Sequence, residues 1–189
     1  MNRFTFNLPT LIIMNKIIIT AAFVTLTATL FAQNSFVITP GAEVTVTGNT
    51  PITLQNMNFV NNGIFNAGNG SIVITGNTLS TINGTNSISF FNLTVNNTGG
   101  VNLGRSIAVN NQLDMSGMMN LKNNSISLGT NASIINESET NRLTDDAGNS
   151  GNVTTVRNFA SPLASVNPAN IGVEFVNAPA LGNTTITRY

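Results

Sequence analysis

Residues 144–152 hold the side chains of this sequence that are best suited to bind a metal ion. Asp145 and Asp146 supply carboxylates, and Asn149 supplies an amide oxygen between glycines. Oxygen ligands of this kind surround Ca²⁺ in flexible loops. The spacing matches neither the EF-hand loop nor the Gly-rich nonapeptide repeats. We therefore predict a solvated turn, with Ca²⁺ held by Asp145, Asp146 and Asn149 as the alternative, and we expect no other cofactor.

Paired carboxylates are the second chemistry to consider. Glycoside hydrolysis needs two carboxyl groups on either side of a sugar, and lyase chemistry needs a base with charge stabilisation. Only Glu137 with Glu139 and Asp145 with Asp146 are close in sequence. Neighbouring residues of a strand point to opposite faces, so Asp145 and Asp146 could share a site only in a loop. We predict that the protein is not an enzyme, and we keep a carbohydrate-active β-helix enzyme as an alternative.

Composition excludes several other classes of function. The chain has no His and no Cys, which removes the commonest ligands of zinc and the Ser-His and Cys-His catalytic pairs. Seven Lys and Arg residues are too few for a basic groove that neutralises nucleic-acid phosphates. A composition of 41% hydrophobic and 7% charged residues is unlike that of a disordered chain. The stability of the fold must therefore come from backbone pairing and apolar packing.

The first 32 residues have the order of a secretory signal peptide. Lys16 precedes an apolar stretch over residues 17–32, and the small residue Ala32 precedes Gln33. Met14 places the positive charge directly after the start, so we predict that Met14 is the true start and that residues 1–13 are not part of the protein. Cleavage after Ala32 removes two of the seven basic residues and no acidic one. We expect a weakly acidic, exported chain.

The remainder of the chain has the pattern of many short β-strands. Val, Ile and Phe alternate with Ser and Thr at period two, which indicates strands with one buried face. Asn and Gly separate these runs and are typical of turns that need positive φ. The clearest predicted strands are residues 43–47, 71–75, 87–91, 92–95, 106–109, 125–128, 132–135, 152–157, 172–176 and 184–187.

Recurring words suggest that these strands belong to stacked, quasi-equivalent units. Residues 44–50 read VTVTGNT and residues 72–78 read IVITGNT, and Val-Asn-Asn begins at Val60, Val95 and Val109. A single coil buries too few apolar side chains to offset its loss of backbone entropy, so such units must stack. Turn asparagines could then form amide ladders along the stack. We predict an all-β fold, a right-handed parallel β-helix (β-solenoid), with a β-sandwich as the alternative.

Residues 88–128 resemble the solenoid regions of large secreted surface proteins of Bacteroidota. The resemblance lies in FNLTVNN over residues 91–97, GVNL over residues 100–103 and LKNNSISLG over residues 121–129. Residues 170–189 are similar to a segment that often follows those regions. The resemblance implies an exported protein, often displayed on the outer surface, of the kind that commonly ends in a type IX secretion sorting domain. It brings no catalytic motif.

These observations give a predicted organisation of the chain. Residues 1–32 are the signal peptide, residues 33–136 the β-solenoid, residues 137–151 a polar loop, and residues 152–189 further strands of a longer protein of which this is the N-terminal part. We expect a non-enzymatic, structural or adhesive module, a stalk or surface scaffold, that is secreted or held at the outer cell surface. A carbohydrate-binding β-sandwich is a further alternative. Expected partners are surface glycans or other cell-surface proteins, with no nucleic acid and no membrane span after signal cleavage.

Overall fold

The computed structural model describes residues 34–49, 51–148 and 150–189. Eighteen strands and one short 3₁₀ helix, η1 (Pro168–Asn170), make up the regular structure of these residues. The prediction of an all-β fold is confirmed. The predicted signal peptide lies outside the described residues. Among the helices that the structure describes, none has the length and apolar character needed to cross a bilayer.

One sheet collects a strand from each successive turn of the chain, and we call it face A. Every neighbouring pair in this sheet is parallel. Ser35 pairs with Asn58 and Phe59 pairs with Ile82, so the chain returns to this face after 23 residues in the first turns. The strands in spatial order are β1 (Ser35–Ile38), β4 (Asn58–Asn61), β7 (Ser80–Asn83), β9 (Val101–Leu103), β11 (Met119–Asn120) and β14 (Leu143–Thr144).

Two further faces complete each turn. Face B consists of β2 (Glu43–Thr45), β5 (Ile64–Asn66), the first halves of β8 (Ser89–Asn97) and β10 (Ile107–Met115), β12 (Ser125–Leu128) and β15 (Asn152–Phe159). Face C consists of β3 (Pro51–Gln55), β6 (Ser71–Gly76), the second halves of β8 and β10, and β13 (Ser133–Ile135).

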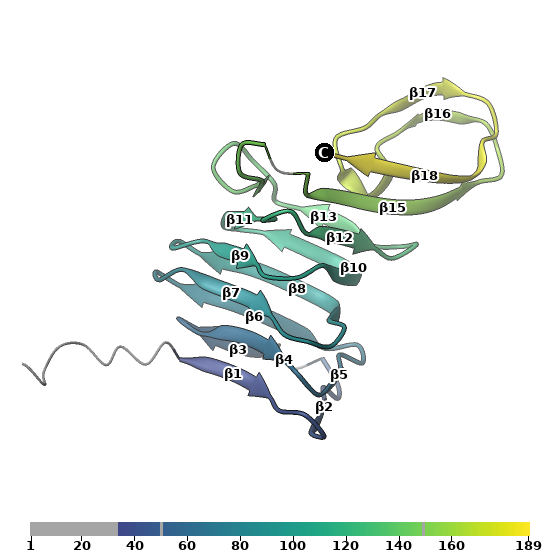
Figure 1. Ribbon diagram of the computed structural model, residues 1–189. Helices are drawn as coiled ribbons and strands as arrows, with labels where there is room; N and C mark the ends of the chain where they lie inside the picture. Colours follow the sequence, from purple (N-terminus) through teal and green to yellow (C-terminus); the bar gives the residue numbers. More distant parts are fainter. Residues whose placement is uncertain (1–33, 50, 149) are drawn as a thin grey trace, which may run out of the picture. The chain divides into compact units, whose positions relative to one another are not determined.

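The faces follow one another in the order A, B, C through about five turns (Figure 1). On face C, Ser71 pairs with Asn92, Asn92 with Gln112 and Gln112 with Ser133, an interval of 20 or 21 residues. Parallel pairing between successive turns confirms the predicted β-solenoid and excludes the β-sandwich. The repeated words at Val44 and Ile72 do not mark this period, because they lie in β2 and β6 on different faces.

Apolar side chains form continuous columns inside the stack. Leu54, Ile74, Val95 and Met115 are register partners in four successive turns of face C, and each is at most 3% exposed. Near the first turns, the ring of Phe59 contacts those of three other phenylalanines at centroid distances of 5.0–5.7 Å. Each turn therefore contributes a few apolar groups to a core that only neighbouring turns complete.

Asparagine side chains join the turns at the corners. The Asn56 side-chain oxygen accepts hydrogen bonds from the backbone N–H groups of Asn77 and Thr78 in the next turn, at 2.8 and 3.2 Å. Gly76 permits this contact, because its φ is +125° and an added Cβ would lie 2.0 Å from that oxygen. Most such amides bond to backbone groups or hydroxyls rather than to each other. In the described residues, the predicted amide ladder is limited to Asn111, which donates to Asn92 at 2.7 Å.

The repeat ends where the chain turns back on itself. β15 pairs in parallel with β12 on one side and antiparallel with β18 (Gly182–Arg188) on the other. In the chain segment that connects β15 to β18, β16 (Leu163–Val166) and β17 (Phe175–Ala178) form an antiparallel ribbon. β14 lies within the predicted polar loop, residues 137–151, and adds a last short strand to face A.

Ile74→Asp tests the direction in which the face C column points. Ile74 is completely buried, so the substitution would place an unpaired charge in the core. We expect a loss of unfolding free energy larger than about 4 kcal/mol, measured by urea denaturation. Ile74→Val, at about 1 kcal/mol, gives a measurable value if the aspartate variant does not fold. Thr53→Asp on the outer side of the same face is the control and should change stability by less than about 0.5 kcal/mol. Equal stability of the two aspartate variants would contradict the inward position of Ile74.

Candidate functional site

Asp145 is held by backbone groups around one corner of the last turn. One of its carboxylate oxygens accepts from the N–H groups of Asn123 and Asp146, at 3.2 and 3.0 Å. The other accepts from the N–H of Gly151 at 2.6 Å. Because the side chain satisfies donors of two neighbouring turns, Asp145 fixes the path of this corner.

Asp146 follows directly but faces different partners. Its carboxylate oxygens accept from the Lys122 ammonium group at 2.5 Å and from the Asn120 amide at 2.6 Å. The hydrogen bond from Lys122, followed by that from Asn120, lowers the pKa of Asp146 below its usual value. Asp146 is exposed, so this ion pair lies on the surface of the protein.

The solvated turn at this loop, with calcium binding as its alternative, stays a prediction. Both carboxylates already accept hydrogen bonds from protein donors, and a cation would have to replace some of them. Asn149 lies outside the described residues. Within residues 34–49, 51–148 and 150–189, there is no group of three or more acidic, His or Cys side chains that could hold a metal ion.

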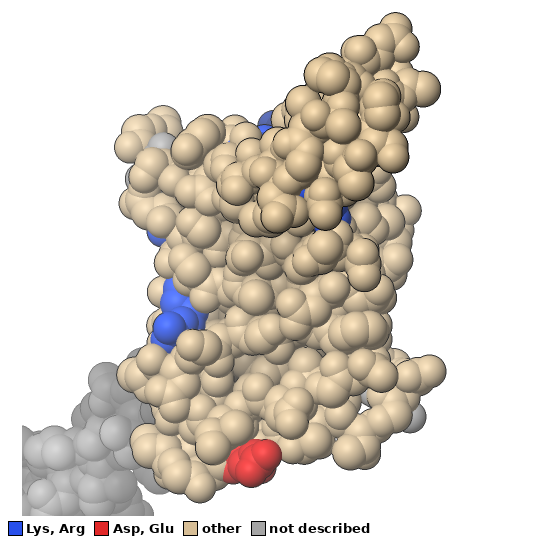
Figure 2. All heavy atoms as spheres, turned by 90° about the vertical axis from the view of Figure 1, so that its right-hand side faces the viewer, with Lys and Arg blue, Asp and Glu red and all other residues tan. Residues whose placement is uncertain are grey.

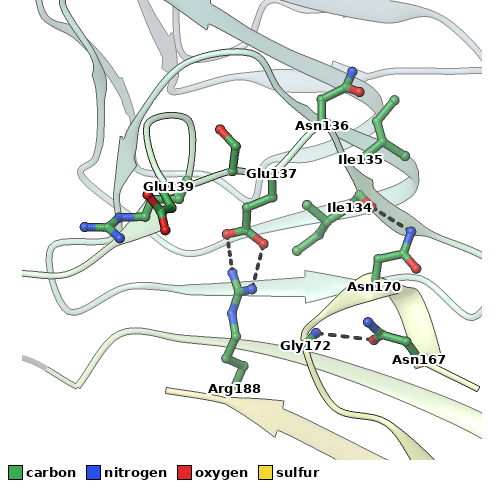
Figure 3. Close-up of a pocket in the computed structure, with 11 residues that line it drawn as sticks. Ile134, Ile135, Asn136, Glu137, Glu139, Asn167, Asn170, Gly172 and Arg188 are labelled. Atoms are coloured by element: carbon green, nitrogen blue, oxygen red, sulfur yellow. Dashed lines mark hydrogen bonds and ion pairs between the residues drawn. The ribbon is translucent and has the colours of Figure 1, made fainter.

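A pocket of about 580 Å³ opens beside residues 134–142, at the C-terminal end of the solenoid (Figure 3). The end of β13, the loop that follows it, η1 and β18 all contribute to its lining. Glu137 and Glu139, which the sequence brings together, both lie on this pocket, as do Arg142 and Arg188. Four charged side chains therefore lie around this one cavity.

Glu137 and Arg188 form a two-pronged ion pair across the pocket. The guanidinium nitrogens of Arg188 donate to the two oxygens of Glu137 at 2.7 and 2.8 Å, and both side chains are about three-quarters buried. The N–H of Leu143 also donates to Glu137, at 3.2 Å. Glu137 therefore ties together the loop after β13, the start of β14 and the end of β18. Three donors bond to the carboxylate oxygens of Glu137. This arrangement suits a structural role, in which Glu137 holds the three segments together, better than a role in proton transfer.

Unusual backbone conformations surround this pocket. Asn136 and Asn170 have φ values of +60° and +56°, and the buried Ala169 has a φ of +58°. The amide of Asn170 donates to the carbonyl of Ile134 at 3.0 Å, which joins η1 to β13 (Figure 3). Asn adopts this region readily, whereas an alanine there is strained. No local pattern in the sequence indicated these contacts, because their partners lie 36 to 51 residues apart.

Comparisons of the chain with protein-family models, with curated proteins and with solved structures found no match.

Removal of the Glu137 charge tests the role of the ion pair. Glu137→Gln keeps the shape of the side chain but leaves the Arg188 charge without its partner. We expect a loss of about 1–3 kcal/mol in unfolding free energy. The double variant Glu137→Gln/Arg188→Gln should lose less than the sum of the single variants, measured by chemical denaturation. Glu139→Gln, exposed on the same pocket, is the control. Strictly additive losses would show that the two side chains do not interact.

Calorimetric titration with Ca²⁺ tests the metal alternative. A solvated turn predicts no heat of binding at millimolar Ca²⁺ and no change in melting temperature. Binding would stabilise the folded protein by mass action. A saturable heat that disappears in Asp145→Asn and in Asp146→Asn would replace the solvated turn with a calcium site.

Proposed function

We propose that this chain is a non-enzymatic, exported β-solenoid module that acts as a stalk, spacer or adhesive scaffold at the cell surface. The observation that carries the proposal is the stack of about five parallel turns with one continuous apolar core. Each added turn lengthens such a module by one strand spacing, about 4.8 Å, without any change in its interior. A fold of this kind is well suited to hold other parts of a protein at a distance.

The outer surface of the first turns supports the same proposal. No charged residue lies between Glu43 and Arg105 in the sequence. Figure 2 shows a face on which only isolated groups are charged. On face A, a column of outward polar side chains runs through successive turns: Ser35, Asn58, Thr81, Asn102 and Asn120. A neutral polar surface stays hydrated and does not attract nucleic acids or anionic membranes over long distances.

Partners in this proposal are surface glycans or other cell-surface proteins. Uncharged amides and hydroxyls offer short-range hydrogen bonds, which suit glycans better than highly charged polymers. The signal-peptide pattern of residues 1–32 supports export to the outside of the cell. The resemblance to secreted Bacteroidota surface proteins supports the outer surface as the destination, with type IX secretion as the route.

An activity screen combined with a glycan array tests the absence of catalysis. We expect no turnover of any polysaccharide by the purified chain under hydrolase or lyase conditions. The carboxylates most suited to catalysis are Glu137, Asp145 and Asp146, and each is engaged with protein donors. Turnover that is abolished by Asp145→Asn or Glu137→Gln, in variants that remain folded, would overturn the proposal in favour of a carbohydrate-active enzyme.

A further inference from the structure

A second pocket, of about 390 Å³, lies at the corner between faces A and B. Three successive turns build it. The second turn contributes Ile64 and Phe65, the third contributes Thr85, Asn86 and Ser87, and the fourth contributes Arg105. Arg105 is the only cation in the first four turns of the solenoid, residues 34–49 and 51–115 of the described chain.

Equivalent positions at this corner show what the fold requires there. The register of β8, β10 and β12 aligns Asn86, Arg105 and Asn124 in successive turns. The amide of Asn86 donates to the Gly63 carbonyl at 2.7 Å, and that of Asn124 donates to the Leu103 carbonyl at 2.9 Å. Arg105 makes the same kind of bond, from one terminal nitrogen to the Gly84 carbonyl at 2.9 Å. An asparagine therefore meets the structural need at this position.

The guanidinium group of Arg105 has donors beyond that need. It carries five N–H donors, and a single bond to a carbonyl uses only one of them. Its Nε is buried and has no hydrogen-bond partner, so the donors within reach of a ligand in the pocket are those of the terminal nitrogens. All seven acidic residues lie in the described part of the chain, and none forms an ion pair with Arg105. Glu43 is the register partner of Ile64 at the far wall of the pocket. It lies three turns from Arg105, about 14 Å at the spacing of parallel strands, which exceeds the Debye length of about 8 Å.

The other walls of the pocket narrow the class of ligand. Both N–H groups of the Asn86 amide donate to the carbonyls of Asn62 and Gly63, so its oxygen remains as an acceptor. Ser87 is exposed and offers a hydroxyl, and Ile64, 58% exposed, provides one apolar wall. A guanidinium fork matches a carboxylate in two-pronged geometry, while the Asn86 oxygen and the Ser87 hydroxyl match ligand hydroxyl groups.

We propose that this pocket binds the carboxylate of a sugar acid, with Arg105 as the anion-binding residue and Asn86 and Ser87 as partners of the sugar hydroxyls. This proposal names acidic glycans as the ligand of an adhesive module. It therefore rests on the adhesive role in the proposed function. A failure to bind sugar acids would leave the stalk and the absence of catalysis untouched, because those rest on the stacked turns.

NMR-monitored titration of the ¹⁵N-labelled chain with sodium D-glucuronate tests this proposal. We expect saturable shifts of the amide signals of Ile64, Asn86 and Ser87 at millimolar ligand, and no such shifts with D-glucose at the same concentration. Arg105→Asn copies the residue found in the neighbouring turns, so it should keep the denaturation midpoint of the parent chain and weaken glucuronate binding at least tenfold. Arg105→Lys keeps the charge without the fork and should weaken binding by a smaller factor.

Arg142→Gln is the matched control, since it removes an exposed arginine elsewhere and should leave the binding constant unchanged. The proposal is overturned if Arg105→Asn binds glucuronate as well as the parent chain does, or if glucose produces the same shifts. Equal affinity for inorganic sulfate would show a general anion site rather than a sugar-acid site. Tighter binding of a short peptide through its C-terminal carboxylate at the same residues would replace the glycan with a protein partner.

Discussion

A single turn of this chain cannot satisfy its own backbone or bury its own apolar side chains, and the structure depends on that constraint. Strands of two to nine residues have few partners within a turn, so their N–H and C=O groups pair with the turns above and below. The side chains of Leu54, Ile74, Val95 and Met115 are shielded from solvent only because they stack on one another in successive turns. Ordering one turn therefore favours ordering the next, and the absence of cysteine is compensated by this cooperation between neighbours.

The abundance of asparagine follows from the geometry of the corners. Where strands end, backbone donors and acceptors lose their sheet partners, and an amide can serve both kinds of group. Asn97 illustrates this, since it donates to the Thr78 carbonyl at 2.8 Å while accepting from the N–H of Gly99 at 2.9 Å. A charged side chain in the same place would supply only donors or only acceptors. Arg105 departs from this rule, because its guanidinium group bonds to the Gly84 carbonyl and keeps further donors that the fold does not use.

The sequence predicted the strands of faces B and C far better than those of face A. β12 alternates Ser with Ile and Leu, and β6 is a run of β-branched residues between Ser71 and Thr75, so their patterns stand out. The strands of face A are two to four residues long and often contain Asn, as in β11 with Met119 and Asn120, so too few residues show alternation. Residues 87–91 and 92–95 were two predicted strands, whereas β8 is one strand that crosses from face B to face C. The sequence did not predict which strands pair with each other, because the turns differ in length and so leave no constant period in the sequence.

The candidate sites show the same limit. Asp145 and Asp146 were found by composition, but their separate partners depend on the turn below. The contact of Glu137 with Arg188 joins residues 51 positions apart, and only the reversal of the chain after β15 brings them together. Local patterns indicate which residues could act, whereas the register of the stack decides what each one touches.

Disulfide mapping tests the stacked register most directly, because the native chain contains no cysteine. Thr53 pairs with Val73 in the next turn, and Val73 pairs with Thr94 in the turn after that. A disulfide needs Cα atoms within about 7 Å, which one strand spacing allows and two do not. We therefore expect mild oxidation to cross-link Thr53→Cys/Val73→Cys but not Thr53→Cys/Thr94→Cys, as read by peptide mass spectrometry. Cross-linking of the second pair without the first would contradict the stacked register on which this account depends.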